Sequence, residues 1–391
     1  MREETTVVHS GLHPERFQGA LNPPVFHAST ILSQTVEEYR RKRKDWIGEV
    51  PGTYYGRFGT PTFEALQEAI AALEGGHRCV LYPSGLAACA GALLAFLSAG
   101  DHLLVSDSVY GPTRNLARGL LKRFGVSTTF FDPLLGRGIE SLIQPSTRVI
   151  YLESPGSLTF EVQDVPAIAE VARRRGITTV IDNTWATPLC FKPLAHGVDV
   201  SVQSATKYIV GHSDAMLGAI TCSKEAWPKL RSSTYELGQT AGPDDVYLGQ
   251  RGLRTLAVRL KQHGEAGVAL AQWIARQPEV ERVLHPALPG DPGHAIWKRD
   301  FTGASGLFGV VLKEGVTDRA LCAMIDGLEL YGIGSSWGGF ESLIVPFDPR
   351  EARTATRWPH QGPCFRIHAG LENVEDLLAD LEAGFKRLRL T

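Results

Sequence analysis

The chain of 391 residues is longer than a typical single domain and suggests two or three domains of about 150 residues each. Hydrophobic residues make up 43% and charged residues 21%, as in a globular protein with a sizeable core. Lys plus Arg (40) nearly balance Asp plus Glu (42), and the net charge of −2 gives no support to a nucleic acid or membrane partner.

Cysteine usage and the first residues indicate a cytoplasmic protein. Residues 1–17 lack the apolar core of a signal peptide, and no apolar run approaches the ~20 residues of a membrane span. No two cysteines have a C-x-x-C spacing, so we expect free thiols in a reducing compartment, without disulfides or a metal site. The cysteines lie mostly in apolar context: Cys79, Cys89, Cys190, Cys222, Cys322 and Cys364.

Residues 1–55 show little periodicity, and we interpret them as an extended N-terminal arm. The basic run YRRKRKDW (39–46) favours a solvated helix face or loop over a phosphate-binding patch. Regular structure begins at GTPTFEALQEAIAALEGG, where Thr60 can cap a helix, Pro61 suits its first turn and Gly75 can end it. One face of that helix is apolar at helical spacing, with Phe63, Leu66, Ile70 and Leu73.

Short apolar strands then alternate with helical patterns such as VPAIAEVARRRG (165–176). This alternation predicts a largely parallel sheet covered on both faces, in which ligands bind at the carboxyl ends of the strands. The predicted strands are 79–82, 102–106, 128–131, 148–154, 178–183, 200–204 and 219–222.

The pattern changes after about residue 250. A long helical segment (253–276) precedes two predicted strands, 306–313 and 365–370. The last segment has an apolar helical stripe formed by Val374, Leu377, Leu378, Leu381, Phe385 and Leu388. We therefore predict an arm (1–55), an α/β domain (56–250) and a smaller α+β domain (251–391).

A phosphate site is indicated at YPSGLAACAG (82–91), where an apolar strand leads through Gly85 into a helix. Backbone N–H groups at a helix N-terminus bind phosphate readily. A plain tight turn explains the same residues when they are considered alone. The stretch matches neither the dinucleotide fingerprint nor the P-loop, so nicotinamide and nucleoside triphosphates lack support.

Two further residues give the phosphate site a chemical context. Asp182 ends a buried strand, where it serves either as a turn cap or as the partner of a protonated heterocyclic nitrogen. Lys207 follows another strand and stands between the hydroxyls of Ser204 and Thr206 and a run of small residues. A desolvated lysine has a lowered pKa and attacks carbonyls. Phosphate site, acid and lysine are the three elements that pyridoxal phosphate needs.

Three other positions complete the candidate site. Tyr110 follows the strand 102–106 and can stack on a cofactor ring, although loop tyrosines more often simply pack. Arg366 lies in an apolar strand and needs either a buried carboxylate or a substrate carboxylate. Tyr55 and Arg57 lie near the end of the arm, where a surface loop is the simpler interpretation for a single subunit.

Taken together and in order, these residues resemble the Cys/Met-metabolism family of pyridoxal-phosphate enzymes, and the resemblance covers nearly the whole chain. The motifs that carry it are NPPVFHAST, YYGRFGTPT, YPSGLAA, YLESPGSLTFEVQDV, VIDNTWATP, SVQSATKYIVGHSDAM, RGLRTLAVRL, HPALPG, WKRDFTGASGLF, SSWGGFESL and RIHAGLE. It implies the aspartate-aminotransferase-like fold (fold type I) and a homotetramer built from two dimers.

The resemblance also implies a role for each residue. Lys207 would hold the cofactor and move protons, Asp182 would pair with the pyridinium nitrogen, and Tyr110 would stack on the ring. Gly85 and Leu86 would donate backbone N–H groups to the phosphate, with help from Ser204 and Thr206. The remaining implied roles are phosphate contacts to the neighbouring subunit for Tyr55 and Arg57, and substrate carboxylate binding for Arg366 with Ser336 and Trp337.

HPALPG, WKRDFTGASGLF and SWGG resemble the β-eliminating branch of the family. The implied reaction cleaves L-cystathionine to homocysteine, pyruvate and ammonia, a step of transsulfuration toward methionine, with L-cysteine or cystine as further substrates. Ser335 and Phe58 depart from the pattern of that branch near the distal end of the substrate. The γ-lyase and γ-synthase chemistries of the same family therefore remain an alternative. A non-catalytic interaction protein is a more distant one, because Lys207, Asp182 and Arg366 are all present.

Overall fold

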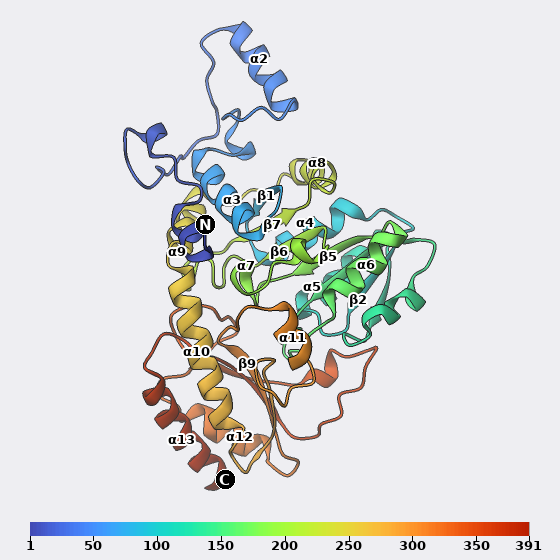
Figure 1. Ribbon diagram of the computed structural model, residues 1–391, viewed down its shortest axis with the longest axis vertical. Coiled ribbons are helices and arrows are strands. Elements are labelled where there is room, and N and C mark those ends of the chain that lie inside the picture. The colour runs from blue at the N-terminus through green and yellow to red at the C-terminus, as the bar shows by residue number, and fades with distance from the viewer. Residues whose placement is uncertain (391) are drawn as a thin grey trace.

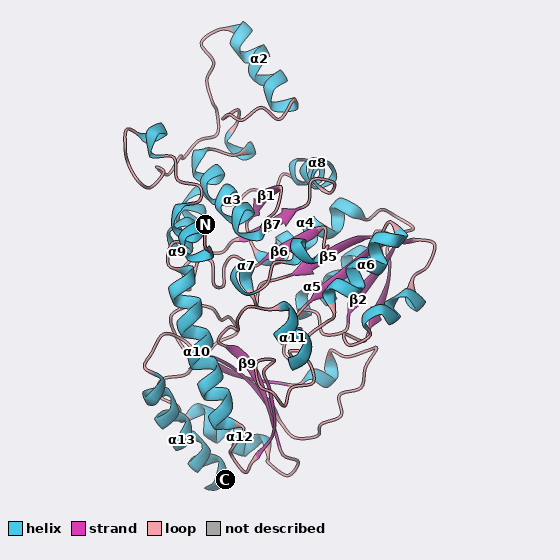
Figure 2. Cartoon of the chain, in the orientation of Figure 1, coloured by secondary structure: helices cyan, strands magenta, loops and turns pink. Residues whose placement is uncertain are grey.

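The computed structural model describes residues 1–390, apart from the side chain of Glu351. Two sheets organise the chain, one above the other in Figures 1 and 2, and the long helix α10 runs alongside both. Among these residues no helix is both long and apolar enough to cross a membrane. The helices are α1 (Glu3–His9), α2 (Val36–Ile47), α3 (Pro61–Glu74), α4 (Gly85–Phe96), α5 (Gly111–Leu116), α6 (Val165–Arg175), α7 (Thr187–Cys190), α8 (Trp227–Leu237), α9 (Pro243–Leu253), α10 (Leu256–Ile274), α11 (His294–Asp300), α12 (Asp318–Asp326) and α13 (Val374–Leu390).

The larger sheet has seven strands in the order β1-β7-β6-β5-β4-β2-β3. All neighbouring pairs are parallel except those of β7, which is antiparallel to both β1 and β6. The mainly parallel sheet predicted from the apolar strands is thereby confirmed. Its strands are β1 (Arg78–Tyr82), β2 (His102–Ser106), β3 (Ser127–Phe131), β4 (Thr147–Glu153), β5 (Thr178–Asp182), β6 (Val200–Gln203) and β7 (Gly218–Cys222).

Helices cover both faces of this sheet, because its strands are apolar on both sides. Side chains of α4 and α8 pack on one face and those of α3, α6 and α9 on the other. The four apolar residues predicted to form one face of α3 are all buried. Thr60 stands at the N-cap position of α3, but its hydroxyl makes no capping bond and is buried without a partner.

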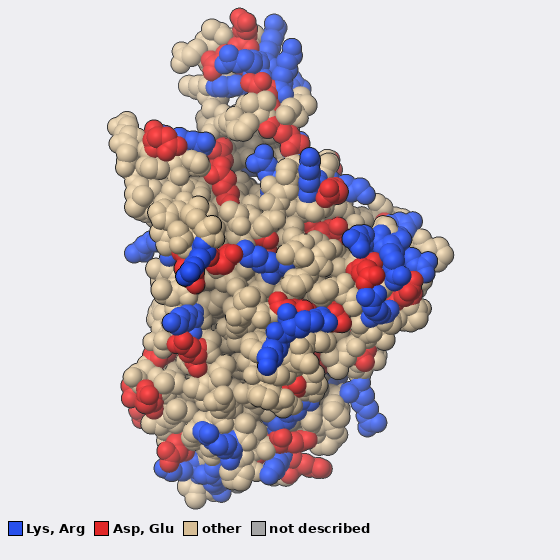
Figure 3. Space-filling view, viewed as in Figure 1, with Lys and Arg blue, Asp and Glu red and all other residues tan. Residues whose placement is uncertain are grey.

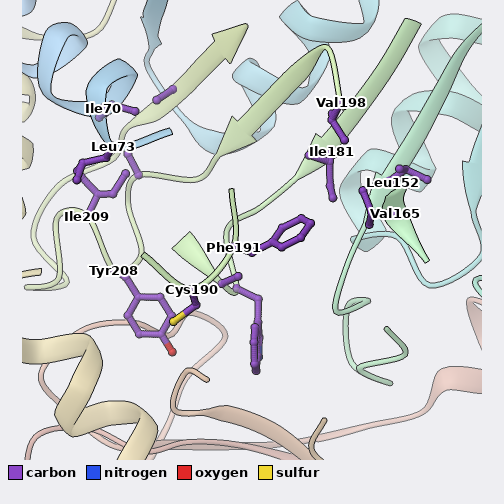
Figure 4. Packing of buried hydrophobic residues seen from close by; sticks show 14 of the residues in the cluster. Ile70, Leu73, Leu152, Val165, Ile181, Cys190, Phe191, Val198, Tyr208 and Ile209 are labelled. Carbon is purple, nitrogen blue, oxygen red and sulfur yellow. The ribbon is translucent and has the colours of Figure 1, made fainter. Parts of the chain in front are cut away.

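The smaller sheet has the order β10-β11-β12-β9-β8 and is antiparallel except for the β10–β11 pair. Side chains along β9 alternate between two clusters, so that Phe308 and Val310 face α10, α12 and α13, while Leu307 and Val311 face the larger sheet. One core therefore joins the two sheets, and Figure 4 shows part of it. The strands are β8 (Val280–Leu284), β9 (Leu307–Leu312), β10 (Gly332–Ile333), β11 (Leu343–Phe347) and β12 (Cys364–His368).

The N-terminal segment is less uniform than the sequence predicts. Helix α1 packs against the body of the protein, with Val7 fully buried and the guanidinium of Arg254 donating to the carbonyls of Val7, Val8 and Ser10. Helix α2 instead protrudes from the body, and charged side chains cover it (Figures 1 and 3). None of its residues is buried, so the basic run is a solvated helix face, as predicted.

Candidate active site

Several of the candidate residues lie at or just beyond the carboxyl ends of strands of the larger sheet, as predicted for an open α/β sheet. Asp182 is the last residue of β5, and Lys207 follows the end of β6 by four residues. The loop 335–339 joins β10 to β11 of the other sheet and lies against Lys207. At Gly338 a Cβ atom would lie 3.1 Å from the Cα of Lys207, and the backbone φ is +86°. Glycine is therefore required at that point.

Lys207 lies in a partly desolvated position with a hydroxyl at its amine. Its Nζ donates to Ser336 Oγ at 2.7 Å and lies 5.3 Å from the centre of the Trp337 ring. Burial lowers the pKa of Lys207 to about 8; the positive charge of Arg366 lowers it further, and Asp182 opposes the shift. At neutral pH the amine is thus far more often neutral, and so nucleophilic, than an ordinary lysine.

The backbone of the lysine loop is fixed by its next residue, Tyr208, which is fully buried in the shared core (Figure 4). Its hydroxyl accepts the N–H of Gly306 at 3.2 Å, and its ring packs at 5.4 Å from that of Trp337. Lys207 therefore stands on a segment anchored to both sheets. Such anchoring keeps the amine in place without using a charged partner.

Arg366 lies on β12 and faces the same site. Its Nη2 donates to the carbonyl of Ser335 at 2.9 Å. Among the side chains that the structure describes, no Asp or Glu forms an ion pair with it. Burial lowers the pKa of Arg366 to about 10, so the guanidinium remains charged at neutral pH. A charged, half-buried guanidinium without a carboxylate partner is suited to bind a substrate carboxylate.

Asp182 is buried and oriented by Thr184. The Oδ1 atom accepts the backbone N–H of Thr184 at 3.0 Å and its hydroxyl at 2.5 Å, whereas the nearest donor to Oδ2 is the Cys89 thiol at 3.8 Å. Burial raises the pKa of Asp182 against these hydrogen bonds and the charge of Lys207. Oδ2 is therefore poorly satisfied, and a protonated ring nitrogen would suit it. Asp182 also bonds like a turn cap, so both interpretations of this residue fit its contacts.

The N-terminus of α4 forms a cradle for an anion. The hydroxyl of Ser84 accepts the N–H of Ala87, whereas the N–H groups of Gly85 and Leu86 find no acceptor among residues 1–390. A Cβ at Gly85 would lie 2.4 Å from Ser204 Oγ, so the absence of a side chain brings that hydroxyl to the helix end. The cradle fits the phosphate of pyridoxal phosphate, and Asp182 and Lys207 fit its ring nitrogen and aldehyde.

Thr206 fits this set less directly. Its hydroxyl donates to the carbonyl of Leu217 at 3.1 Å and accepts the N–H of Leu217 at 2.8 Å. In this arrangement it braces the strand end beside Lys207. Its contact with a phosphate remains a prediction, as does that of Ser204.

Tyr110 stands at the N-cap position of α5, with 44% of its surface exposed. Burial of its hydroxyl raises the pKa of Tyr110, and nearby Cys89 and Asp182 raise it further. Stacking of the Tyr110 ring on the cofactor remains a prediction. Its backbone N–H donates to Glu153 Oε2 at 2.6 Å.

Tyr55 and Arg57 are not joined to the Lys207 cluster within one chain. Tyr55 precedes the short turn Gly56–Phe58, and Arg57 lies within it and donates to the carbonyl of Tyr235 at 3.0 Å. Phe58 stacks on Trp46 with 4.4 Å between ring centres. A role for Tyr55 and Arg57 at the neighbouring subunit therefore remains a prediction.

Size alone does not locate this site. A hollow of about 1460 Å³ lies between α1, α7 and α10, and none of the predicted site residues lines it. The chemistry of the residues and the ends of the strands are better guides.

Sequence reasoning missed Glu153 and Thr184. Glu153 ends β4 as Asp182 ends β5, and an acid at the end of an apolar strand was the signal that could have found it. Thr184 hydrogen bonds Asp182 two residues before it and also accepts the N–H of Ser204 at 2.8 Å. That second bond joins the acid to the anion cradle and depends on β5 and β6 being neighbours.

Comparison with known proteins agrees with this geometry. The model of the family described as "Cys/Met metabolism PLP-dependent enzyme" matches residues 4–386. The chain is 45% identical over 391 residues to cystathionine beta-lyase MetC of Escherichia coli (strain K12), covering 98% of each chain. It is 42% identical over 396 residues to the L-alanine/L-glutamate racemase of Wolbachia pipientis wMel, covering 99% of this chain and 98% of that protein. The crystal structure of metB from Corynebacterium glutamicum aligns with a TM-score of 0.91 and 29% identity, over 99% of this chain and 98% of that one.

Proposed function

The chain belongs to the Cys/Met metabolism family of pyridoxal-5'-phosphate-dependent enzymes, and we propose that it is a carbon–sulfur lyase that cleaves L-cystathionine by β-elimination. L-cystathionine and water would yield homocysteine, pyruvate and ammonia, a reaction of methionine biosynthesis. The 45% identity to a cystathionine β-lyase over 98% of both chains carries the choice of substrate. The arrangement of Lys207, Asp182 and Arg366 supports pyridoxal phosphate as the cofactor.

Each residue has a task that its contacts support. Bound pyridoxal phosphate would supply an electron sink for the electron pair left when the Cα proton departs. Arg366 binds the α-carboxylate of the substrate in the half-buried position where it lacks another partner. Lys207 takes the Cα proton at Nζ, since burial lowers its pKa to about 8 and makes a neutral amine accessible.

Other groups hold this arrangement in place. Asp182 would pair with the ring nitrogen and keep it protonated, while Thr184 fixes its Oδ1. Ser336 accepts a hydrogen bond from the Lys207 amine and so orients its lone pair. Gly85 and Leu86 would bind the phosphate through their free backbone N–H groups. Tyr110 would stack on the ring, and the hydrogen bond of its backbone N–H to Glu153 holds its loop.

The assembly we propose is a homotetramer in which neighbouring subunits share active sites through the arm. Among the described residues of one chain, neither Tyr55 nor Arg57 contacts the Lys207 cluster. In addition, several large apolar side chains of the arm are exposed to solvent. Leu32 is 81% exposed, Val36 66% and Ile47 62%. Such a set is typical of a covered interface. The units proposed are an arm (1–55), a cofactor domain (56–250) and a C-terminal domain (251–391).

A shared site can be tested by mixing variants. Tyr55→Phe and Arg57→Ala should each weaken cofactor binding, because they remove phosphate contacts. At a cofactor concentration too low to saturate Arg57→Ala, a mixture of Arg57→Ala and Lys207→Ala chains should be more active after dissociation and reassembly than either variant alone, since some sites then combine an intact Lys207 with an intact Arg57. Unchanged cofactor affinity and no complementation would refute the shared site.

We also propose that the enzyme works in the cytoplasm. All six cysteines are free thiols and five are buried, with Cys322 exposed, which suits a reducing compartment.

Product analysis tests the reaction itself. Purified, cofactor-loaded protein would receive L-cystathionine, and the keto acid and thiol would be identified. Pyruvate with homocysteine is expected. Formation of 2-oxobutyrate with cysteine would instead establish γ-elimination and make Ser335 and Phe58 the first positions to examine.

A second candidate activity is amino-acid racemisation, favoured by the 42% identity to an L-alanine/L-glutamate racemase over nearly the full length. The same preparation should be incubated with L-alanine and with L-glutamate, followed by chiral chromatography. Racemisation that outpaces pyruvate formation from L-cystathionine would replace the lyase proposal. It would leave the cofactor assignment intact.

A further inference from the structure

Glu153 and Asp182 form a pair of neighbouring acids at the base of the site. They are register partners at the ends of the adjacent parallel strands β4 and β5. Side chains at paired positions of parallel strands point to the same face of the sheet. Tyr151 and Val180, two residues earlier on each strand, both pack on the α4 side. Glu153 and Asp182 therefore face that side together.

Neither acid has a cationic partner. Among the side chains that the structure describes, no Lys, Arg or His forms an ion pair with either carboxylate. Glu153 accepts one hydrogen bond, from the backbone N–H of Tyr110 at 2.6 Å. Asp182 accepts its short hydrogen bonds from Thr184. Asp182 is buried and Glu153 is partly buried, and two neighbouring carboxylates in such a place resist ionising together, which favours one proton on the pair.

The groups around Glu153 indicate where that proton resides. Burial and the charge of Asp182 raise the pKa of Glu153 well above its usual range. The other titratable groups facing it are Cys89, Tyr110 and Tyr151, whose pKa values are all raised, mainly by burial. No cation among residues 1–390 contributes to the pKa shift of Glu153. The charge of Lys207 acts on Asp182, and that of Arg366 acts on Tyr110 and Lys207. A protonated ring nitrogen opposite Asp182 would keep that acid ionised and leave the proton on Glu153.

We propose that Glu153 is a positioning residue that works as a neutral acid, holding the Tyr110 loop while Asp182 carries the negative charge that faces the cofactor ring. This inference rests on the proposed cofactor site but is independent of the substrate. Glu153 reaches the reaction through the Tyr110 backbone and through its effect on Asp182. An ionised Glu153 would raise the pKa of Asp182 by repulsion between the two carboxylates and so weaken the pairing of Asp182 with the ring nitrogen.

The test compares the cofactor binding of three variants with that of the wild-type enzyme. Glu153→Gln keeps the acceptor for Tyr110 and cannot ionise, Glu153→Ala removes the acceptor, and Asp182→Asn removes the charge. Glu375→Gln, on the exposed start of α13, is the matched control for the amide exchange. The readouts are the apparent cofactor dissociation constant from pH 6 to 10 and the visible circular dichroism of the bound cofactor, which reports its surroundings.

Glu153→Gln should bind the cofactor within about threefold of wild type near neutral pH, because the hydrogen bond is preserved. Glu153→Ala should bind about tenfold more weakly, with altered circular dichroism, since the Tyr110 N–H loses its acceptor. As the pH rises, the wild type should lose affinity relative to Glu153→Gln, because only the wild type can ionise there. The titration of Lys207 is common to both proteins, so it cancels in the ratio of their cofactor dissociation constants.

Three results for the variants would count against the inference. Equal damage in Glu153→Gln and Glu153→Ala would show that the carboxylate acts in its ionised form. If Glu153→Ala binds the cofactor as tightly as the wild type, Glu153 has no positioning role. If Asp182→Asn does not weaken cofactor binding, the negative charge that faces the ring is not that of Asp182. If L-cystathionine is not cleaved but the cofactor binds as expected, the substrate proposal fails and the role of Glu153 stands. If the wild type binds no pyridoxal phosphate, both proposals fail.

Discussion

The lowered pKa of Lys207 predicts how fast the cofactor-free enzyme recaptures pyridoxal phosphate at each pH. Only the neutral amine attacks the aldehyde, so the rate should rise with pH and level off above the lysine pKa. With a pKa of about 8 instead of 10.5, about one-tenth of the amines are neutral at pH 7. That fraction is about 300 times larger than for a lysine at its ordinary value.

Two variants separate the physical causes of this shift. Burial is the largest, followed by the charge of Arg366, whereas Asp182 acts in the opposite direction. In Arg366→Gln the midpoint of the pH profile should move upward but remain below that of an ordinary lysine. In Asp182→Asn it should move downward. Arg276→Gln, at an exposed position after α10, is the matched control and should leave the midpoint unchanged.

The assay removes the cofactor, adds a fixed excess of pyridoxal phosphate and follows the return of visible absorbance by stopped flow. The ionisation of free pyridoxal phosphate is the same for every protein, so differences between variants report the lysine. A wild-type midpoint near the ordinary lysine value would refute the argument from burial. A downward shift in Arg366→Gln would refute the argument from charge.

Three further predictions concern the same molecule. Lys207→Ala should lose the visible absorbance of the bound cofactor and nearly all turnover while keeping its far-ultraviolet circular dichroism; retention of both absorbance and turnover would show that another group holds the cofactor. Asp107→Ala should destabilise the protein by about 3–5 kcal/mol, because it leaves Arg114, whose side chain is 4% exposed, as an unpaired buried charge. It also removes the acceptor of the backbone N–H groups of Thr354, Ala355 and Thr356. The double variant Asp107→Ala/Arg114→Ala should recover part of that loss in denaturant unfolding, and an Asp107→Ala protein within about 1 kcal/mol of wild type would mean that the buried pair is dispensable. Glu74 is 1% exposed, and burial raises its pKa from 4.5 to about 7. The unfolded chain therefore releases the Glu74 proton at lower pH than the folded one, and the wild type should lose up to about 3 kcal/mol of stability relative to Glu74→Gln as the pH rises from 4.5 to 7. Parallel stability profiles for the two proteins between pH 4.5 and 8 would contradict this.

Local pattern in the sequence determined the elements that carry the site. Strands such as β2 (His102–Ser106) are apolar on both faces, and such runs between helical patterns predict a covered parallel sheet wherever they occur. The carboxyl ends of those strands follow from chain direction alone, which is why Asp182 and Lys207 could be identified without coordinates. The same reasoning overlooked Glu153, although it stands at an equivalent strand end.

Tertiary structure alone decided which of these residues meet. The contact of Lys207 with Ser336 spans 129 residues, and the bond of Thr354 to Asp107 spans 247. Periodicity reports which face of an element is buried, but it contains nothing about which element covers that face. The pairing of Glu153 with Asp182 depends on β4 lying beside β5, and the packing of α1 depends on Arg254 binding its last carbonyls. Strand order and docking arise from the summed packing of the whole core, so only the folded chain determines them.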